Sequence, residues 1–286
     1  MEQKLSIAIQ KKGRLAEKSL ALLRECGISL SHGSGRLKAE AANFPLEVLF
    51  LRDDDIPEYV ANGVADAGIV GENVLDEKQK GIVIAEKLGF SRCRLSIAVR
   101  REDPYAGPES LAGRRIATSY PNILRRFLDE HGVAAGIEVI SGSVEIAPSI
   151  GLAEAVCDIV STGSTLLTNG LREVEVVMRS QAVLATHPDL STESAALLQQ
   201  LQFRINAVRN ARRNKYILLN APNGAIGSIT QLLPGMKSPT ILPLATPGWS
   251  SLHSVVPEDQ FWEVIDQLRD LGAEGILVVP IEKMIV

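Results

Sequence analysis

Apolar runs of strand length alternate with helical patterns along the N-terminal part of the chain. Residues 5–9, 46–51 and 67–70 are mainly apolar and too short for helices, while leucines at helical spacing follow Gly13. The acidic run before Pro57 is typical of a helix start, because carboxylates near a helix N-terminus complement its dipole. Strands that alternate with helices in this way predict an α/β fold with parallel strands.

A second α/β segment follows the first. Its pattern predicts strands at 95–99, 115–117 and 137–140 and helices at 122–131 and 150–156. Asp158 then lies on an apolar run that opens into a polar loop. We expect two lobes: residues 1–96, to which residues 178–205 return, form lobe I, and residues 97–177 form lobe II.

One short pattern occurs in both segments. Asp66 precedes Gly71 by five positions, and Asp158 precedes Gly163 by the same interval. If the lobes are similar, both glycines lie at the carboxyl ends of strands, where open α/β sheets bind ligands. The alternative is a chance likeness between two strand–helix turns.

The pattern changes again after a long helical stretch at 191–215. From residue 216 onward the predicted order is strand, helix, strand, strand, helix, strand. This is the order of elements in a ferredoxin-like domain. We expect residues 206–286 to form a third domain.

Composition narrows the class of protein. The 286 residues are 45% hydrophobic with a net charge of −4, which predicts a substantial core and argues against a basic surface for nucleic acid. The three cysteines and four histidines lack metal-ligand spacing, so no metal site built from protein ligands is predicted. The first residues are too polar for a signal peptide, and no apolar run reaches the length of a membrane span. A cytoplasmic enzyme fits these features.

The stretch after Asp158 is the strongest candidate for chemistry. It offers four hydroxyls and a glycine that allows close backbone approach, in the order Ser161, Thr162, Gly163, Ser164 and Thr165. A helix signal follows directly, and a helix N-terminus behind such a loop binds anions. The carboxylate of Asp158 suits a neighbouring sugar diol, so the pattern indicates a sugar phosphate. The alternative is a strand that ends in an ordinary polar turn.

Several longer motifs resemble those of one enzyme family. They are Gln10-Lys-Lys-Gly-Arg-Leu, Asp66-Ala-Gly-Ile-Val-Gly-Glu-Asn, the loop that follows Asp158, Asn169-Gly-Leu-Arg and Pro280-Ile-Glu-Lys-Met. The chain resembles the long form of ATP phosphoribosyltransferase, the first enzyme of histidine biosynthesis, over essentially its whole length.

This resemblance implies two periplasmic-binding-protein-like lobes around a catalytic cleft and a C-terminal regulatory domain that binds histidine as an inhibitor. It implies a Mg²⁺-dependent transfer of phosphoribosyl from phosphoribosyl pyrophosphate to N1 of ATP, with release of pyrophosphate. It also implies a homo-oligomer, in which dimers assemble into a hexamer.

Matching the motifs residue by residue implies catalytic roles for Arg14, Glu145 and Asp158. Asp158 would hold the ribose diol, and the loop at 161–165 would hold the 5′-phosphate. Arg14 would contact phosphates of ATP or pyrophosphate, and Glu145 would contact a substrate in the same cleft. The alternative for Arg14 is an ordinary surface arginine.

The same matching implies that Asp66, Gly71, Asn73 and Tyr120 complete the substrate site. Two alternatives stay open, because Asp66 would equally suit a strand cap and Tyr120 would equally suit the core.

The tail carries the residues that resemble the family's histidine site, namely Asn220, Met236, Ser238, Thr240 and Ala273. Some family members have Asp at the position of Asn220, so recognition of a cationic group there is in doubt. Two other classes of protein remain open: a two-lobed solute-binding module and a regulatory protein of the same ancestry without catalysis.

Overall fold

A computed structural model describes residues 3–31 and 37–286. The chain divides into two compact units, which we describe separately. The first comprises Met1–Ala21 and Ile28–Leu198, and the second comprises Leu22–Gly27 and Gln199–Val286. Among the described residues, no helix is long and apolar enough to cross a membrane.

The first unit contains a six-stranded mixed sheet, which we call lobe I together with its helices. Its strands lie in the order β2 (Lys38–Glu40), β3 (Leu46–Leu51), β1 (Leu5–Gln10), β4 (Ala67–Gly71), β11 (Ala182–Thr186) and β5 (Val83–Lys87). The strands β3, β1 and β4 are parallel to one another, while β11 runs antiparallel between β4 and β5. Its helical segments are α1 (Arg14–Glu25), η1 (Asp53–Asp55), α2 (Ile56–Ala61) and α3 (Glu72–Lys78).

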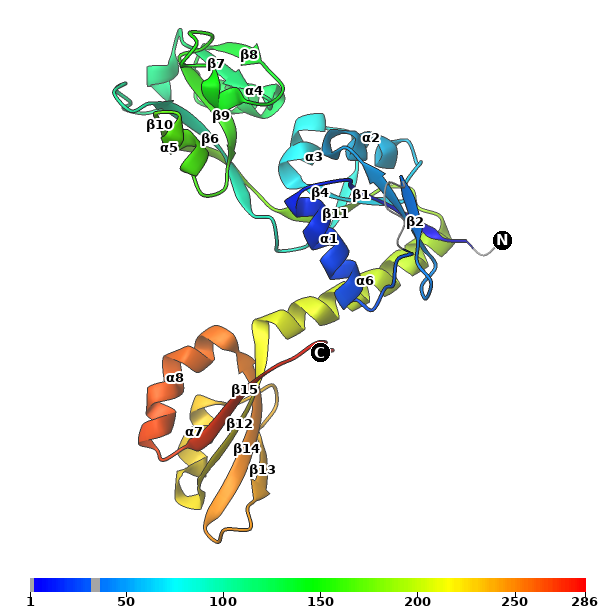
Figure 1. The fold of residues 1–286 in the computed structure, drawn as a ribbon, viewed down its shortest axis with the longest axis vertical. Coiled ribbons are helices and arrows are strands. Elements are labelled where there is room, and N and C mark those ends of the chain that lie inside the picture. The colour runs from blue at the N-terminus through cyan, green and yellow to red at the C-terminus, as the bar shows by residue number, and fades with distance from the viewer. Residues whose placement is uncertain (1–2, 32–36) are drawn as a thin grey trace. The chain divides into compact units, whose positions relative to one another are not determined.

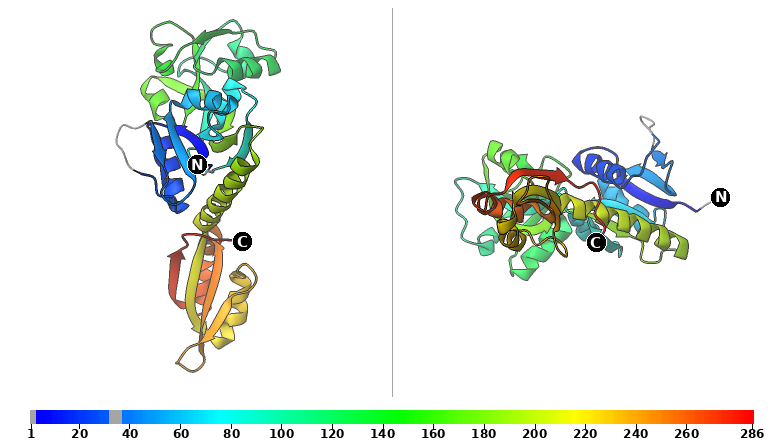
Figure 2. Two further views of the ribbon diagram at one scale, coloured as in Figure 1. Left: turned by 90° about the vertical axis from the view of Figure 1, so that its right-hand side faces the viewer. Right: turned by 90° about the horizontal axis from the view of Figure 1, so that it is seen from below.

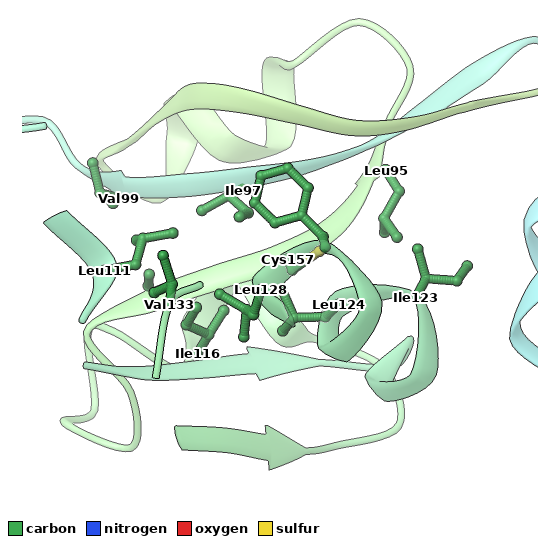
Figure 3. Close-up of a cluster of buried hydrophobic side chains, with 12 residues drawn as sticks. Leu95, Ile97, Val99, Leu111, Ile116, Ile123, Leu124, Leu128, Val133 and Cys157 are labelled. Carbon is green, nitrogen blue, oxygen red and sulfur yellow. The ribbon is translucent and has the colours of Figure 1, made fainter. Parts of the chain in front are cut away.

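Lobe II of the same unit is built on a five-stranded sheet. Its strands lie in the order β10 (Leu171–Ser180), β6 (Cys93–Arg100), β9 (Ala155–Val160), β7 (Arg115–Thr118) and β8 (Gly136–Val139). Its helical segments are η2 (Pro108–Leu111), α4 (Pro121–Glu130), η3 (Val144–Ile146) and α5 (Ser164–Thr168). Figure 3 shows one side of its core, where Leu124 and Leu128 of α4 pack with Ile97, Ile116 and Cys157 of the sheet.

Two short segments connect the lobes. One joins β5 to β6 at residues 88–92, and the other is Gln181, between β10 and β11. Backbone hydrogen bonds pair the first segment with the residue that follows Gln181, since Leu88 N donates to Ala182 O and Ala182 N donates to Phe90 O, each at 2.9 Å. The crossing is therefore a paired two-strand connection.

One predicted element of lobe II is wrong. The helix expected at 150–156 does not form: residues 150–154 are turns and irregular backbone, and β9 begins at Ala155. Ala155, Val156 and Cys157 are fully buried in the middle of the sheet. A strand covered on both faces has no polar alternation, so its apolar run is easily taken for a helix segment.

The second unit ends in a four-stranded antiparallel sheet. The strands lie in the order β13 (Thr240–Pro243), β14 (Trp249–Pro257), β12 (Asn214–Pro222) and β15 (Glu274–Pro280). Helices α7 (Ile226–Leu232) and α8 (Glu258–Asp270) cover one face of the sheet, as Figure 1 shows, and the 3-10 turn η4 (Asn223–Ala225) leads into α7. The predicted ferredoxin-like order is confirmed. The predicted long helix is α6 (Thr192–Arg213), which the left view of Figure 2 shows as one continuous helix.

Candidate active site

The phosphate-loop candidate and the three predicted catalytic residues line one cavity. The cavity measures about 250 Å³ and includes Arg14, Glu145, Asp158 and the loop residues Ser161, Thr162, Gly163, Ser164 and Thr165. These residues come from three separate places in the sequence: the start of α1, the turn η3, and β9 with the loop that follows it. The structure therefore brings together all three predicted catalytic residues and the whole loop.

The loop conformation depends on its glycine. Gly163 has φ of +84°, in the left-handed region, and is the N-cap of α5. A Cβ there would meet only a side-chain atom of Val160 at 3.9 Å, so the requirement for glycine comes from the backbone rather than from crowding. Leu166 is buried and anchors α5, while the hydroxyl side chains before it are exposed. The hydroxyls therefore stand open to a ligand on a fixed backbone.

Asp158 lies near the end of β9 and is largely buried. Its Oδ1 accepts a hydrogen bond from the backbone N–H of Ile159 at 2.8 Å. Burial raises the pKa of the Asp158 carboxyl, and the nearby charge of Glu145 raises it further. A partly buried carboxylate near a second negative charge is stabilised by hydroxyl donors or by a cation. A ribose diol would supply the hydroxyls, and a metal–pyrophosphate complex would supply the cation.

A second cavity adjoins the first. It measures about 460 Å³ and is lined from lobe I by Gln10, Arg14, Lys18, Asp53, Gly71 and Asn73 and from lobe II by Tyr120 and Ser161, among others. Arg14, Ile159 and Ser161 line both cavities. Together the two cavities offer room for a sugar phosphate and a second substrate side by side.

Asn73 connects the lobes at this place. Its Oδ1 accepts from Ser180 Oγ at 2.7 Å, and its Nδ2 donates to the Tyr120 hydroxyl at 3.1 Å. Both side-chain ends are thus engaged by protein, and Asn73 is buried. Gly71 accommodates this network, because a Cβ there would lie 2.4 Å from Asn73 Oδ1. Asn73 therefore supports the wall of the cavity by holding Tyr120.

Tyr120 combines the two roles left open by the sequence. It lines the larger cavity and also packs against the lobe II core. Burial, and after it the charge of Asp158, raises the pKa of the Tyr120 hydroxyl. The side chain is therefore a neutral hydrogen-bonding group at the edge of the site.

Asp66 does not join this group. It lies immediately before β4, whereas Gly71 ends that strand, and Asp66 lines neither of the two cavities. Its Oδ2 accepts the backbone N–H of Ser6 at 2.7 Å, which is the strand-capping role. The likeness to Asp158 misled because Asp158 lies within β9, whereas Asp66 precedes the first residue of β4, so the two aspartates occupy different positions along their strands.

Sequence patterns also missed a residue of the site. Asp53 lines the larger cavity, and its Oδ1 is a buried atom without a hydrogen-bond partner among the described residues. Burial and then the charge of Asp54 raise the pKa of the Asp53 carboxyl to about 6. The sequence feature that could have indicated Asp53 is its position just after β3. This strand runs parallel to β1, with Leu51 opposite Gln10. Carboxyl ends of neighbouring parallel strands lie together.

The residues expected to bind histidine fall into two places. Met236, Ser238 and Thr240 line a cavity of about 320 Å³ together with Tyr216 and His253. The Tyr216 hydroxyl lies 2.7 Å from His253 Nδ1.

The two other predicted histidine-site residues lie elsewhere in the sheet domain. Ala273 is buried in the core between sheet and helices. Asn220 lies on the central strand β12, opposite Ser251 and Glu274. Neither lines the cavity that contains Ser238.

Comparison with known proteins gives the family. Residues 52–207 match the family model described as ATP phosphoribosyltransferase, and residues 211–283 match the model of the HisG C-terminal domain. The ATP phosphoribosyltransferase of Cytophaga hutchinsonii is 62% identical over 285 residues, which is 100% of each chain. The chain belongs to the ATP phosphoribosyltransferase family. It is a long-form member, because the C-terminal domain is present.

Other relatives place this ATP phosphoribosyltransferase among similar proteins. The Bacteroides thetaiotaomicron enzyme is 56% identical over 282 residues, covering 99% of this chain and 100% of its own. A solved ATP phosphoribosyltransferase complex from Thermotoga maritima has a chain that is 29% identical, with a TM-score of 0.60 over 71% of this chain and 98% of its own. A histidine kinase sensor domain similar to periplasmic binding proteins shares the fold alone, at 15% identity and a TM-score of 0.50 over 73% of this chain and 91% of its own.

Proposed function

We propose that this chain transfers the phosphoribosyl group of phosphoribosyl pyrophosphate to N1 of ATP, forming phosphoribosyl-ATP and pyrophosphate in the first step of histidine biosynthesis. The observation that carries the proposal is the shared cavity of Asp158, Glu145, Arg14 and the hydroxyl loop at 161–165. A carboxylate for a diol beside a loop for a phosphate matches a ribose 5-phosphate. Family membership supplies the identity of the second substrate.

In this proposal each wall of the cavity recognises one part of the sugar. The loop hydroxyls and the start of α5 hold the 5′-phosphate, and Asp158 accepts hydrogen bonds from the ribose hydroxyls. Arg14 lines both cavities, so it is placed to contact phosphates of either substrate. ATP then occupies the larger cavity near Tyr120 and Asn73.

The reaction needs positioning and charge neutralisation rather than a protein nucleophile. The lone pair of adenine N1 forms a bond to the anomeric carbon, the bond from that carbon to pyrophosphate oxygen breaks, and the electron pair leaves with pyrophosphate. Holding the two substrates in adjoining cavities supplies proximity. Arg14, Lys18 and Arg92 line the larger cavity and would stabilise the developing negative charge.

Mg²⁺ fits this arrangement as a partner of pyrophosphate. Among residues 3–31 and 37–286, no group of three or more His, Cys, Asp or Glu side chains could enclose a metal ion. The cavity does offer the carboxylates of Asp158 and Glu145, and the charge of Glu145 raises the pKa of Asp158. Mg²⁺ usually takes one or two carboxylates and completes its shell with phosphate and water oxygens. Bound there, it would neutralise leaving-group charge.

We further propose that the C-terminal domain binds histidine and inhibits the reaction. The support is the separate sheet domain with a cavity that presents hydroxyls at Ser238 and Thr240 and the ring of His253. The proposal retains the division into residues 1–96 with 178–205, residues 97–177 and residues 206–286. It includes assembly of dimers into a hexamer and a cytoplasmic location.

The test of the reaction is direct. Protein, ATP, phosphoribosyl pyrophosphate and Mg²⁺ are mixed with pyrophosphatase, and phosphoribosyl-ATP is followed by its absorbance. Formation that requires both substrates supports the proposal. Binding of either substrate without turnover would instead indicate a solute-binding or regulatory protein.

The test of regulation is a calorimetric histidine titration combined with inhibition assays. Ser238→Ala and Thr240→Val should raise the dissociation constant and the inhibition constant of histidine by the same factor, because histidine inhibits through occupancy of this one site. Ser228→Ala on the exposed surface of α7 is the matched control. Absence of binding at millimolar histidine, or binding without effect on the rate, would leave the domain a role in assembly only.

A further inference from the structure

Helix α4 of lobe II begins without a cap of its own. Its N-cap residue is Tyr120, which makes no side-chain capping hydrogen bond, and its first residue, Pro121, has no N–H. The next two backbone N–H groups, of Asn122 and Ile123, would have no partner within the helix. Exposed helix starts usually carry Ser, Thr, Asp or Asn for this purpose.

The missing cap comes from the other lobe. Both carboxylate oxygens of Glu77, on α3 of lobe I, accept the N–H of Asn122, at 3.0 and 3.1 Å, and Oε2 also accepts the N–H of Ile123 at 3.0 Å. The side chain of Asn122 in turn donates to the backbone oxygen of Glu77 at 3.0 Å. Glu77 is only 7% exposed, so these bonds form away from solvent. A charged acceptor at a helix start is stabilised by the helix dipole as well.

The same helix holds the residue before the cap. Asn73 precedes Glu77 by one helical turn, so both point from one face of α3. Asn73 Nδ2 donates to the Tyr120 hydroxyl at 3.1 Å, while Glu77 binds the backbone just beyond Tyr120. Lobe I thus holds the hydroxyl of Tyr120, which lines the larger cavity, and the helix start that directly follows Tyr120.

We propose that Glu77 is a positioning residue for the transferase reaction: by capping α4 from the opposite lobe, it holds Tyr120 in the cavity wall and keeps the two lobes together around the substrates. This inference rests on the proposed function. Glu77 lines neither substrate cavity, so it acts through α4 and not by contact with the reacting atoms.

The neighbouring ion pair provides a matched control. Asp76 on α3 pairs with Arg126 on α4, so it bridges the same two helices one residue away from Glu77. Its side chains are 34% and 44% exposed, and exposed pairs contribute little. Asp76→Asn therefore removes a charge from the same interface without uncapping α4.

Glu77→Gln keeps the length of the side chain but removes its charge and replaces one acceptor by a donor that faces backbone N–H groups. The lobes should then spend more time apart, and substrates that need both lobes should bind more weakly. We expect the Michaelis constants of both substrates to rise about ten-fold, consistent with loss of charge-assisted hydrogen bonds, while the turnover number falls less than about three-fold. Asp76→Asn should stay within about two-fold of wild type in both.

Thiol labelling measures lobe separation without any need for activity. Cys93 lies in the wall of the larger cavity and is half-buried, whereas Cys26 and Cys157 are buried. In Glu77→Gln, Cys93 should react several-fold faster than in wild type, and saturating phosphoribosyl pyrophosphate with ATP should slow it again. The proposal would be overturned if Cys93 in Glu77→Gln is labelled at the wild-type rate and the Michaelis constants also equal those of the wild type.

A measurement on the wild-type protein covers the case in which Glu77→Gln fails to fold. Hydrogen exchange at the amides of Asn122 and Ile123 should slow when both substrates are added, because the cap then opens less often. The amide of Leu124, which donates to Tyr120 O within α4, is the internal reference. Equal protection with and without substrates would contradict the role in closure. Absence of turnover with intact substrate-dependent protection would contradict the proposed reaction, while the role of Glu77 in capping α4 and holding the lobes together would stand.

Discussion

Replacing Asp53 by Asn is expected to stabilise the protein at neutral pH. Burial, followed by the charge of Asp54, raises the pKa of the Asp53 carboxyl from its ordinary 3.8 to about 6. This difference corresponds to roughly 3 kcal/mol of unfolding free energy at about 1.36 kcal/mol for each pKa unit. The figure is an upper value because the side chain retains some contact with solvent. The physical source is a carboxylate whose buried Oδ1 has no partner among the described residues.

The pH dependence has a definite sign. The folded state favours the protonated Asp53, so this stability is fully present below about pH 4 and is lost as the pH rises through about 6. The Asn side chain does not titrate. The advantage of Asp53→Asn over wild type should therefore be largest near about pH 8, fall to about half near pH 5 and vanish near pH 3.

The assay must report on lobe I. Both tryptophans, Trp249 and Trp262, lie in the second unit, so their fluorescence reports the unfolding of that unit and not of lobe I. Scanning calorimetry or far-UV circular dichroism should be used, with Asp55→Asn as the exposed control, because Asp55 is not among the charges that raise the Asp53 pKa. Activity should fall in Asp53→Asn as stability rises, because the carboxylate faces the cavity. No stabilisation near pH 8, or an advantage that grows toward low pH, would refute the reasoning.

Three further predictions concern single side chains. Asp158→Asn should raise the Michaelis constant for phosphoribosyl pyrophosphate by about ten-fold, because charge-assisted hydrogen bonds to the ribose hydroxyls are lost, and should raise that for ATP far less. Equal effects on the two constants in steady-state kinetics would argue against this contact. Asp66→Ala should lower the unfolding free energy by about 1–2 kcal/mol through loss of the bond to Ser6 N and leave both Michaelis constants unchanged, which denaturation and kinetics check together. Cys93→Ala and Cys157→Ala should keep turnover near wild type, and a folded variant with more than about ten-fold lower turnover would contradict it.

Local patterns predicted most of the elements that build the site. Apolar runs of strand length gave β1, β3 and β4, and the hydroxyl-rich loop after Asp158 lies in a cavity with Arg14 and Glu145. These features can be predicted from the sequence because each depends on residues close together in the chain. The helix expected at 150–156 was wrong because a strand buried on both faces lacks alternation.

Features that depend on contacts between residues far apart in the chain could not be predicted from the sequence. Glu77 caps a helix that starts 44 residues later in the chain, and the raised pKa of Asp53 comes from its burial in the cavity wall. In the sequence both look like ordinary acidic residues near helix ends. Their environment is set by sheet order and lobe contact, which local composition does not encode.

The placement of β11 has a consequence for biosynthesis. This strand lies between β4 and β5 in the sheet of lobe I, yet it leaves the ribosome after all of lobe II. Until residues 182–186 emerge, the apolar edge of β4 has no partner on that side, and such edges are prone to wrong pairing. Lobe II, whose strands are contiguous in the chain, can complete its sheet first. The N-terminal lobe is therefore the later of the two to finish during synthesis, and it is the one in which a nascent chain is exposed to aggregation.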